Sequence, residues 1–171
     1  MNRPPAFEFD ASLCCGCQAC VVACQDRNDL PPDTGAFRRI RAAESGPPDK
    51  VELGFVSLAC DHCLDPPCLL ACPSGAVHRH QPSGLVLIDE ESCVGCHNCA
   101  LACPFGAPLL VARSGMAKCD LCRSRLEEGL KPACVSVCPT GALDLKPVER
   151  TLRAKQERAA QRARRSGLAG G

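Results

Sequence analysis

Sixteen of the seventeen cysteines fall into four short groups, each of which ends with a Cys-x-x-x-Cys step. In chain order, groups one to four are Cys14, Cys17, Cys20 and Cys24; Cys60, Cys63, Cys68 and Cys72; Cys93, Cys96, Cys99 and Cys103; and Cys119, Cys122, Cys134 and Cys138. Groups one and three have the C-x2-C-x2-C-x3-C spacing of bacterial 4Fe–4S sites, and proline follows groups two to four. This spacing predicts four 4Fe–4S clusters, whose chemistry is the transfer of single electrons.

The last cysteine of each group is expected to bind a different cluster from the first three. Three cysteines spaced by two residues wrap one loop around a cube, whereas the fourth points away and binds the neighbouring cube in two-cluster ferredoxins. Residues 76–80 and 85–89 are β-prone runs around a Pro/Gly turn, which indicates a hairpin between groups two and three. Because group–hairpin–group is the layout of a two-cluster ferredoxin, groups two and three should exchange ligands, which leaves groups one and four to each other.

Four ligand sets follow from this exchange, and each set takes one cysteine from the partner group. The sets are Cys14, Cys17, Cys20 and Cys138 for cluster 1; Cys119, Cys122, Cys134 and Cys24 for cluster 2; Cys60, Cys63, Cys68 and Cys103 for cluster 3; and Cys93, Cys96, Cys99 and Cys72 for cluster 4. Electrons hop between such clusters without bond chemistry at side chains, so no catalytic residue is predicted.

The elements that hold these loops are expected to be short. Residues 6–10 and 142–145 are strands that could pair across the chain ends, residues 51–58 form a strand leading into group two, and residues 120–130 form a short helix. We therefore expect a loop-rich α+β fold of two nested ferredoxin-like modules with short antiparallel strands and short helices. Residues 1–50 and 104–148 would form the outer module, 51–103 the inner module, and 149–171 a basic C-terminal tail.

Two other uses of cysteine fit the sequence less well. A disulfide framework favours an even number of cysteines and a secretory signal, but the count is odd and no apolar segment follows the first residues. Structural zinc sites use two Cys-x-x-Cys pairs separated by a longer stretch, or mix cysteine with histidine. Groups one and three crowd four cysteines into a segment too short for separate zinc sites, although zinc could replace iron in an aerobic preparation.

The composition agrees with a protein built around clusters. The chain has no Trp, no Tyr and five Phe among 171 residues, so it can build little conventional core. The formal net charge is +1, but the thiolates around each cube outweigh its positive core, so the loaded protein is acidic and nucleic acid is not an expected partner. No run of eighteen apolar residues predicts a membrane span, and no export signal or acylation motif is recognised.

Outside the ligand sets the sequence supports modest expectations. Cys15 does not fit the spacing and is interpreted as a small buried filler. Lys118 and Arg113 lie near group four in the sequence, where positive charge would raise the potential of its cluster. The four histidines form no spaced pair with carboxylates and are assigned no role; they are His62, His78, His80 and His97.

Several segments carry a resemblance to a known family. They are CCGCQAC (14–20), FRRI (37–40), CDHCLDPPC (60–68), ACPSGA (71–76), CVGC (93–96), ACPFGAP (102–108) and KCDLC (118–122). In this order the groups resemble the four-cluster electron-transfer subunits of molybdenum or tungsten bisPGD oxidoreductases, in particular the dimethyl sulfoxide reductase iron–sulfur (B) subunits. The similarity runs from residue 6 to residue 146, and the nested ligand exchange is also the arrangement of that family.

The resemblance implies a non-catalytic subunit with two kinds of partner. One is a molybdopterin-containing catalytic subunit, and the other is a membrane anchor that exchanges electrons with a quinone. The chain would be made in the cytoplasm without a signal of its own and would reach the membrane through these partners. Other functions stay open: an electron-transfer subunit of a hydrogenase or formate-hydrogenlyase-type complex, a free-standing polyferredoxin, or a factor that passes clusters to other proteins.

Overall fold

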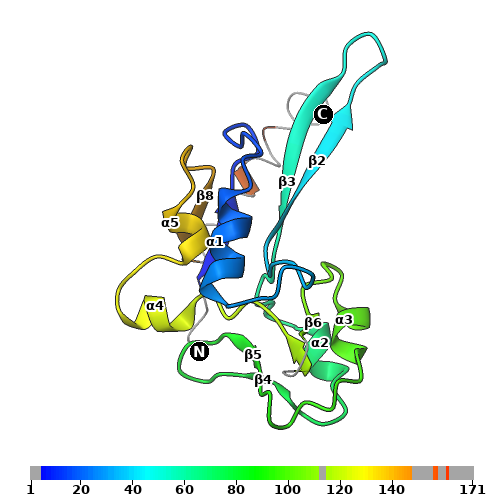
Figure 1. Ribbon diagram of the computed structural model, residues 1–171, viewed down its shortest axis with the longest axis vertical. Helices are drawn as coiled ribbons and strands as arrows, with labels where there is room; N and C mark the ends of the chain where they lie inside the picture. Colours follow the sequence, from blue (N-terminus) through cyan, green and yellow to red (C-terminus); the bar gives the residue numbers. More distant parts are fainter. Residues whose placement is uncertain (1–4, 112–114, 148–155, 158–160, 162–171) are drawn as a thin grey trace, which may run out of the picture.

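The computed structural model describes residues 5–111, 115–147, 156–157 and 161 (Figure 1). In these residues the expected loop-rich α+β character is confirmed, because short helices alternate with four two-stranded antiparallel sheets. The strands are β1 Ala6–Phe9, β2 Arg39–Ser45, β3 Glu52–Leu58, β4 Val77–Arg79, β5 Val86–Ile88, β6 Leu109–Val111, β7 Gly115–Ala117 and β8 Leu143–Lys146. The helices are α1 Ala19–Arg27, α2 Pro67–Leu70, α3 Asn98–Ala102, α4 Arg123–Glu127 and α5 Ala133–Ser136.

The two ends of the described chain meet in one sheet, as predicted. Strand β1 pairs antiparallel with β8, with Ala6 opposite Lys146 and Phe9 opposite Leu143. Helix α1, which follows the loop of group one, packs against α5 of group four. We call this part, made of β1, α1, α5 and β8, the terminal lobe; it forms the upper left of Figure 1.

A second set of elements holds groups two and three together. Strands β4 and β5 pair antiparallel with Val77 opposite Ile88, so the predicted hairpin between these groups is confirmed. Helix α2 of group two packs against α3 of group three. This part, made of α2, β4, β5 and α3, is the central lobe at the bottom of Figure 1.

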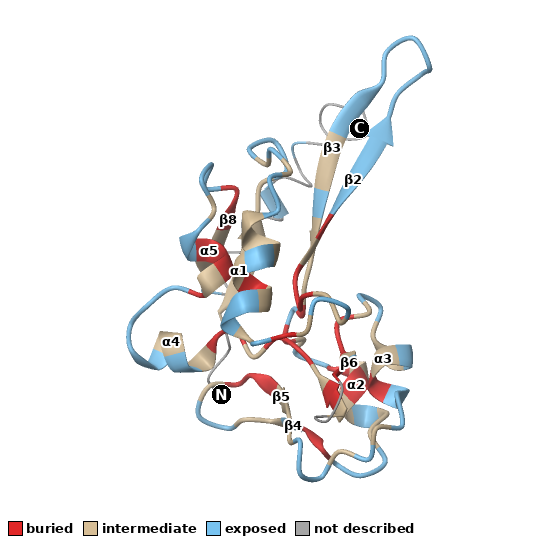
Figure 2. Cartoon of the chain, in the orientation of Figure 1, coloured by how far each residue is buried: buried red, intermediate tan, exposed pale blue. Residues whose placement is uncertain are grey.

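The lobes share one hydrophobic cluster. Leu30 and Phe37, which follow α1, pack in it with Cys60, Val111 and Cys119 from the chain around the central lobe. Figure 2 shows the buried residues gathered at the packed sides of the lobes, with exposed residues on their outer loops. Because cysteines make up much of this cluster, the core and the candidate metal sites occupy the same part of the molecule.

Strand β3 was predicted, but its partner β2 was not. The segment before Val51 contains Pro47 and Pro48, residue types that favour a loop, whereas the structure forms a hairpin whose turn contains both prolines. Gly46 takes φ +98° in this turn, where a Cβ would overlap the carbonyl oxygen of Lys50. The hairpin projects away from the lobes, and its outer half is exposed (Figures 1 and 2).

The helix expected over residues 120–130 is shorter than predicted. Leu121 and Cys122 take φ +64° and +52°, left-handed values that a helix cannot contain, so α4 begins after them. The carboxylate of Asp120 accepts the backbone N–H groups of Cys122 at 2.8 Å and Arg123 at 3.3 Å, which satisfies donors at the helix start. The expected basic tail lies outside the described residues, apart from residues 156, 157 and 161.

Candidate metal centres

The loops of groups one and three have the same backbone geometry. In each loop the residue before the third cysteine's helix is left-handed, with φ +62° at Gln18 and +64° at His97. The reversal turns the chain from an open loop into α1 or α3. The first two cysteines of each group therefore lie on the loop, and the last two lie on or next to the helix.

The loop of group one and the end of group four line one cavity. Its walls contain Cys14, Cys17 and Cys20 together with Cys138, which comes from more than a hundred residues further along the chain. Cys15 lines the same cavity but is exposed, so its interpretation as a buried filler is wrong.

A second cavity lies in the central lobe. It is lined by Cys60, Cys63 and Cys68 of group two and by Cys103, the last cysteine of group three. The structure therefore brings the fourth cysteine of one group to the first three of another at both cavities.

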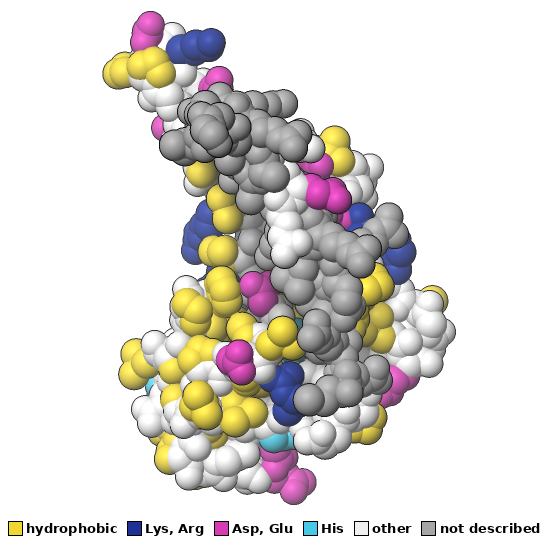
Figure 3. Space-filling model, turned by 180° about the vertical axis from the view of Figure 1, so that it is seen from behind, with side chains coloured by type: hydrophobic (Ala, Val, Ile, Leu, Met, Phe, Trp, Pro, Cys, Tyr) yellow, Lys and Arg dark blue, Asp and Glu magenta, His cyan; other side chains and the backbone are white. Residues whose placement is uncertain are grey.

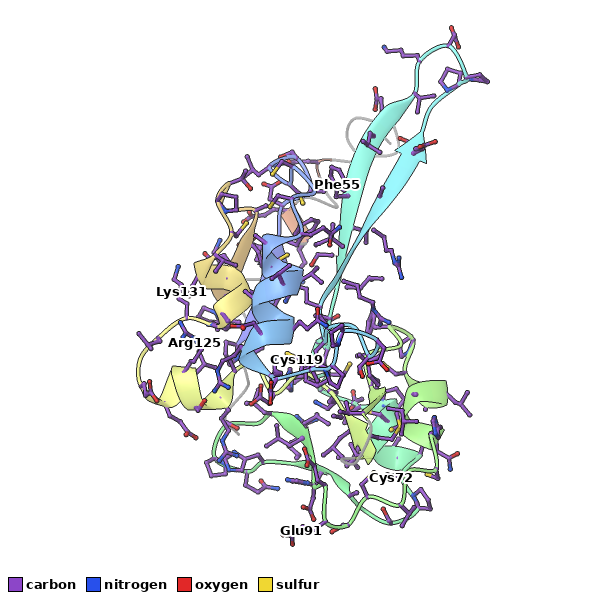
Figure 4. The ribbon with its side chains drawn as sticks, in the orientation of Figure 1. Phe55, Cys72, Glu91, Cys119, Arg125 and Lys131 are labelled. Atoms are coloured by element: carbon purple, nitrogen blue, oxygen red, sulfur yellow. The ribbon has the colours of Figure 1, made fainter. Side chains whose placement is uncertain are left out.

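The other two predicted sets are also brought together in part. Cys24 and Cys122 each lie close enough to Cys134 for its charge to raise their thiol pKa, and Cys119 feels the charge of Cys24. Cys72, Cys93 and Cys99 share a core cluster in the central lobe, whereas Cys96 is exposed on its loop. Figure 4 shows Cys119 where the two lobes meet and Cys72 within the central lobe.

The thiols of these sites suit a metal cofactor better than they suit an empty pocket. Burial, followed by the charge of Cys134, raises the pKa of Cys24 to about 11. Burial also raises the pKa of Cys20, Cys68 and Cys119. Such thiols keep their protons unless a cation replaces them, so metal binding and thiolate formation must occur together.

Backbone N–H groups donate to the cysteine sulfur atoms that follow α2 and α3. Val77 N–H donates to Cys72 Sγ and Ala107 N–H to Cys103 Sγ, both at 3.5 Å. Slight burial raises the pKa of Cys72, but the hydrogen bonds from Val77 and Ser74 outweigh it and the net pKa is lowered. Donors of this kind stabilise thiolates and also raise the potential of a cluster that the thiolates bind.

His62 is a site residue that sequence reasoning missed. Its side chain is 2% exposed and lines the cavity of Cys60, Cys63 and Cys68. Nδ1 accepts the N–H of Val86 at 3.2 Å, which leaves the proton on Nε2, a buried donor without a partner in the described residues. Burial, then the charge of Lys118, lowers its pKa to about 3, so the ring is neutral. A buried unpaired donor at a cysteine-lined cavity indicates an acceptor such as cluster sulfur.

Lys118 also differs from its prediction. Its side chain is buried, and Nζ donates to Cys60 Sγ at 3.5 Å, to Val86 O and to Cys119 O at 3.1 Å. The ammonium group therefore contacts a sulfur of group two, whereas the sequence placed its effect at group four. Arg113, the other predicted cation, lies outside the described residues.

The arrangement fits a group that contains several metal atoms. Among the described residues, no three His, Cys, Asp or Glu side chains converge as ligands of one metal ion. The cysteines instead surround two cavities from several sides, and a buried N–H donor of His62 has no partner at one of them. These features define a class of iron–sulfur proteins with more than one cluster.

Comparisons with known proteins agree with this class. The 4Fe–4S dicluster domain family matches residues 51–148. The probable anaerobic dimethyl sulfoxide reductase chain YnfG of Escherichia coli is 44% identical over 158 residues, which cover 87% of this chain and 76% of that protein. An anaerobic dimethyl sulfoxide reductase chain of Haemophilus influenzae is 42% identical, with 84% and 74% covered, and the thiosulfate reductase electron transfer subunit PhsB of Salmonella typhi is 44% identical, with 78% and 71% covered.

The chain belongs to the 4Fe–4S dicluster family that contains these reductase chains. It is an iron–sulfur electron-transfer protein, as the matched family and the name of PhsB indicate. None of the helices in the described part of the chain is long and apolar enough to cross a membrane.

Proposed function

We propose that this chain holds four 4Fe–4S clusters, bound by the four ligand sets that the sequence predicts. The observation that carries the proposal is the meeting of groups at shared cavities: Cys138 lies with group one and Cys103 with group two. A 4Fe–4S cluster accepts and releases one electron, so four in one small protein form a conducting chain. The side chains bind the clusters, shield them from water and adjust their potentials.

The clusters would be held in two nested ferredoxin-like modules. Groups one and four form the outer module, supported by the pairing of β1 with β8 and the packing of α1 on α5. Groups two and three form the inner module, supported by the β4–β5 hairpin and the packing of α2 on α3. The predicted boundary at residue 50 falls in the turn between β2 and β3, so the projecting hairpin belongs to both segments.

The proposed role is the electron-transfer subunit of a reductase complex of the dimethyl sulfoxide or thiosulfate reductase kind. The names of the relatives support it, and the catalytic partner would be a molybdopterin protein linked to a quinone through a membrane anchor. Exposed apolar side chains on the central lobe also support a protein partner; Leu70 and Leu101 are 83% and 84% exposed. Figure 3 shows hydrophobic side chains gathered on the lower part of the molecule, unlike the polar surface expected of a free polyferredoxin.

Ligand exchange between groups can be tested by replacing single cysteines. We expect Cys103→Ser to perturb the same EPR signal as Cys63→Ser, and a different signal from Cys96→Ser, because Cys103 lies in the cavity of group two. Cys15→Ser is the control, and it should retain all four clusters since Cys15 does not fit the ligand spacing. If Cys103→Ser and Cys96→Ser altered one common signal, each group would bind its own cluster and the nested scheme would be wrong.

The partner is tested by purification from the native host. The tagged chain would be isolated anaerobically at moderate salt, and the bound proteins identified by mass spectrometry with a parallel assay for molybdenum and tungsten. A stoichiometric large subunit that contains either metal supports the proposal and identifies the type of substrate. Hydrogenase subunits would replace it with the hydrogenase alternative, and an iron-loaded chain without partners would establish a free polyferredoxin.

A further inference from the structure

One arginine of the FRRI segment (37–40) is buried inside the protein. Arg38, the residue before β2, is 3% exposed, whereas Arg41 further along the same strand is exposed. Arg39 points toward the loop after group three, where Nη2 donates to the carbonyl oxygens of Phe105 and Gly106. The burial of Arg38 is unusual because a guanidinium keeps its charge at every physiological pH.

The surroundings of Arg38 do not satisfy its guanidinium group. Nη1 donates to the hydroxyl of Ser57 at 2.6 Å, and the group stacks on the ring of Phe7, with Cζ 4.1 Å from the centroid. Nε and Nη2 are buried and have no hydrogen-bond partner in the described residues. A buried cation whose donors remain unpaired is strongly unfavourable, so these donors indicate an acceptor with negative charge.

The position of Arg38 shows where this acceptor would lie. Its partner Ser57 lines the cavity of Cys14, Cys17, Cys20 and Cys138. Arg38 stacks on Phe7. The ring of Phe7 packs against two hydrophobic groups of side chains, one containing Cys24 and Cys119 and the other containing Cys134. Burial raises the pKa of Cys20, and the charge of Arg38 is the main effect that opposes the rise. Arg38 thus lies between the ligand sets proposed for clusters 1 and 2, which we call sites 1 and 2.

We propose that Arg38 raises the redox potentials of clusters 1 and 2, because its charge is buried beside their proposed ligands and two of its N–H donors have no partner in the described residues. This inference rests on the proposed cluster ligands. Taking up one electron makes a site more negative by one unit, and a buried cation stabilises that form through a strong Coulomb attraction. N–H donors to cluster sulfur act in the same direction. Arg38 would therefore make the terminal lobe easier to reduce than the cysteines alone would.

The test is a potentiometric titration of the holoprotein followed by EPR. Arg38→Met retains much of the bulk but removes the charge and the donors. We expect reduction at sites 1 and 2 to become at least tenfold less favourable, which is about 59 mV lower for a one-electron couple. Sites 3 and 4 should be unchanged. Arg41→Gln removes the same charge from the exposed face of β2 and should shift none of the potentials.

Additional variants assign the EPR signals and test the cluster count separately from the role of Arg38. Cys138→Ser and Cys24→Ser identify the signals of sites 1 and 2, and iron and sulfide assays of the wild-type chain test the cluster count by itself. If Arg38→Met binds fewer clusters, Ser57→Ala provides a second test. This variant keeps every cysteine but removes the hydroxyl that accepts the Nη1 hydrogen bond of Arg38, and it should shift the potential of site 1. Fully loaded variants with all four potentials unchanged, or with shifts confined to sites 3 and 4, would overturn the role of Arg38 while leaving the cluster sites standing.

Discussion

Single buried donors distinguish the four cysteine sites from one another. His62 and Lys118 lie beside group two, and Arg38 lies between groups one and four. Each carries buried N–H groups, and two of the three carry a positive charge, close to sites whose proposed cysteine ligands are alike. Because potentials of such clusters depend on hydrogen bonds and local charge, these residues provide a means for sites with the same ligands to differ in potential.

Lys118 offers the sharpest test at this scale. Its ammonium contacts Cys60 Sγ, so Lys118→Met should lower the potential of the signal that Cys63→Ser perturbs. The measurement is an EPR-monitored redox titration, with Lys131→Met as the control because Lys131 is on the surface. A shift confined to the signal of Cys122→Ser would instead support the sequence-based expectation that Lys118 acts on group four.

At the scale of elements, the projecting hairpin also contacts a cluster loop. Gly16, between two cysteines of group one, takes φ +69°, and a Cβ built there would overlap the ring of Phe55 on β3. Phe55 lies where the hairpin passes this loop (Figure 4). Gly95 occupies the matching place in group three at φ +67°, but no atom of the described residues lies near enough to meet a Cβ there. One loop is therefore covered by the hairpin, whereas its counterpart is open.

This difference predicts unequal effects of the same substitution. Gly16→Ala and Gly95→Ala should both cost about 1 kcal/mol for the left-handed backbone. Gly16→Ala should cost about 1–3 kcal/mol more, because the added methyl group must displace an aromatic ring. The rate at which a chelator bleaches the visible absorbance measures both variants. Phe55→Ala should remove the extra loss in the double variant, and equal bleaching of the two single variants would argue against the contact.

At the scale of the whole molecule, cysteines take the place of the large apolar side chains of an ordinary hydrophobic core. The three buried clusters of side chains contain cysteines from every group, and the sequence has no Trp or Tyr. Thiols with pKa values raised by burial cannot supply four thiolates to a site without metal. The fold and the cofactors are therefore expected to be stable only together.

Anaerobic removal of iron should consequently unfold the chain. A compact protein of this length has a radius of gyration of about 16 Å, and an unfolded one about 44 Å. Small-angle scattering and circular dichroism before and after chelation measure the change, and reconstitution with iron and sulfide should reverse it. An apoprotein that keeps the compact radius and its secondary structure would show that side-chain packing alone stabilises the fold.

The sequence by itself determined the chemistry and much of the local structure. Ligand spacing is a local property, so the four groups predicted the loops and the short helices, and the β-prone runs around a Pro/Gly turn predicted the hairpin of β4 and β5. The sequence also predicted the pairing of the chain ends, because short strands were expected before group one and after group four, which were left to each other. The β2 strand was missed because its prolines lie in a turn that only pairing with β3 reveals.

The tertiary structure decided which residues outside the ligand sets reach the sites. Lys118 contacts a sulfur atom 58 positions away, and His62 accepts a hydrogen bond from a residue 24 positions away. Buried Arg38 contacts Phe7 of β1 and Ser57 of β3, which come from distant parts of the chain. Such contacts depend on how the two lobes and the hairpin pack together, and no local pattern of residue types encodes that packing.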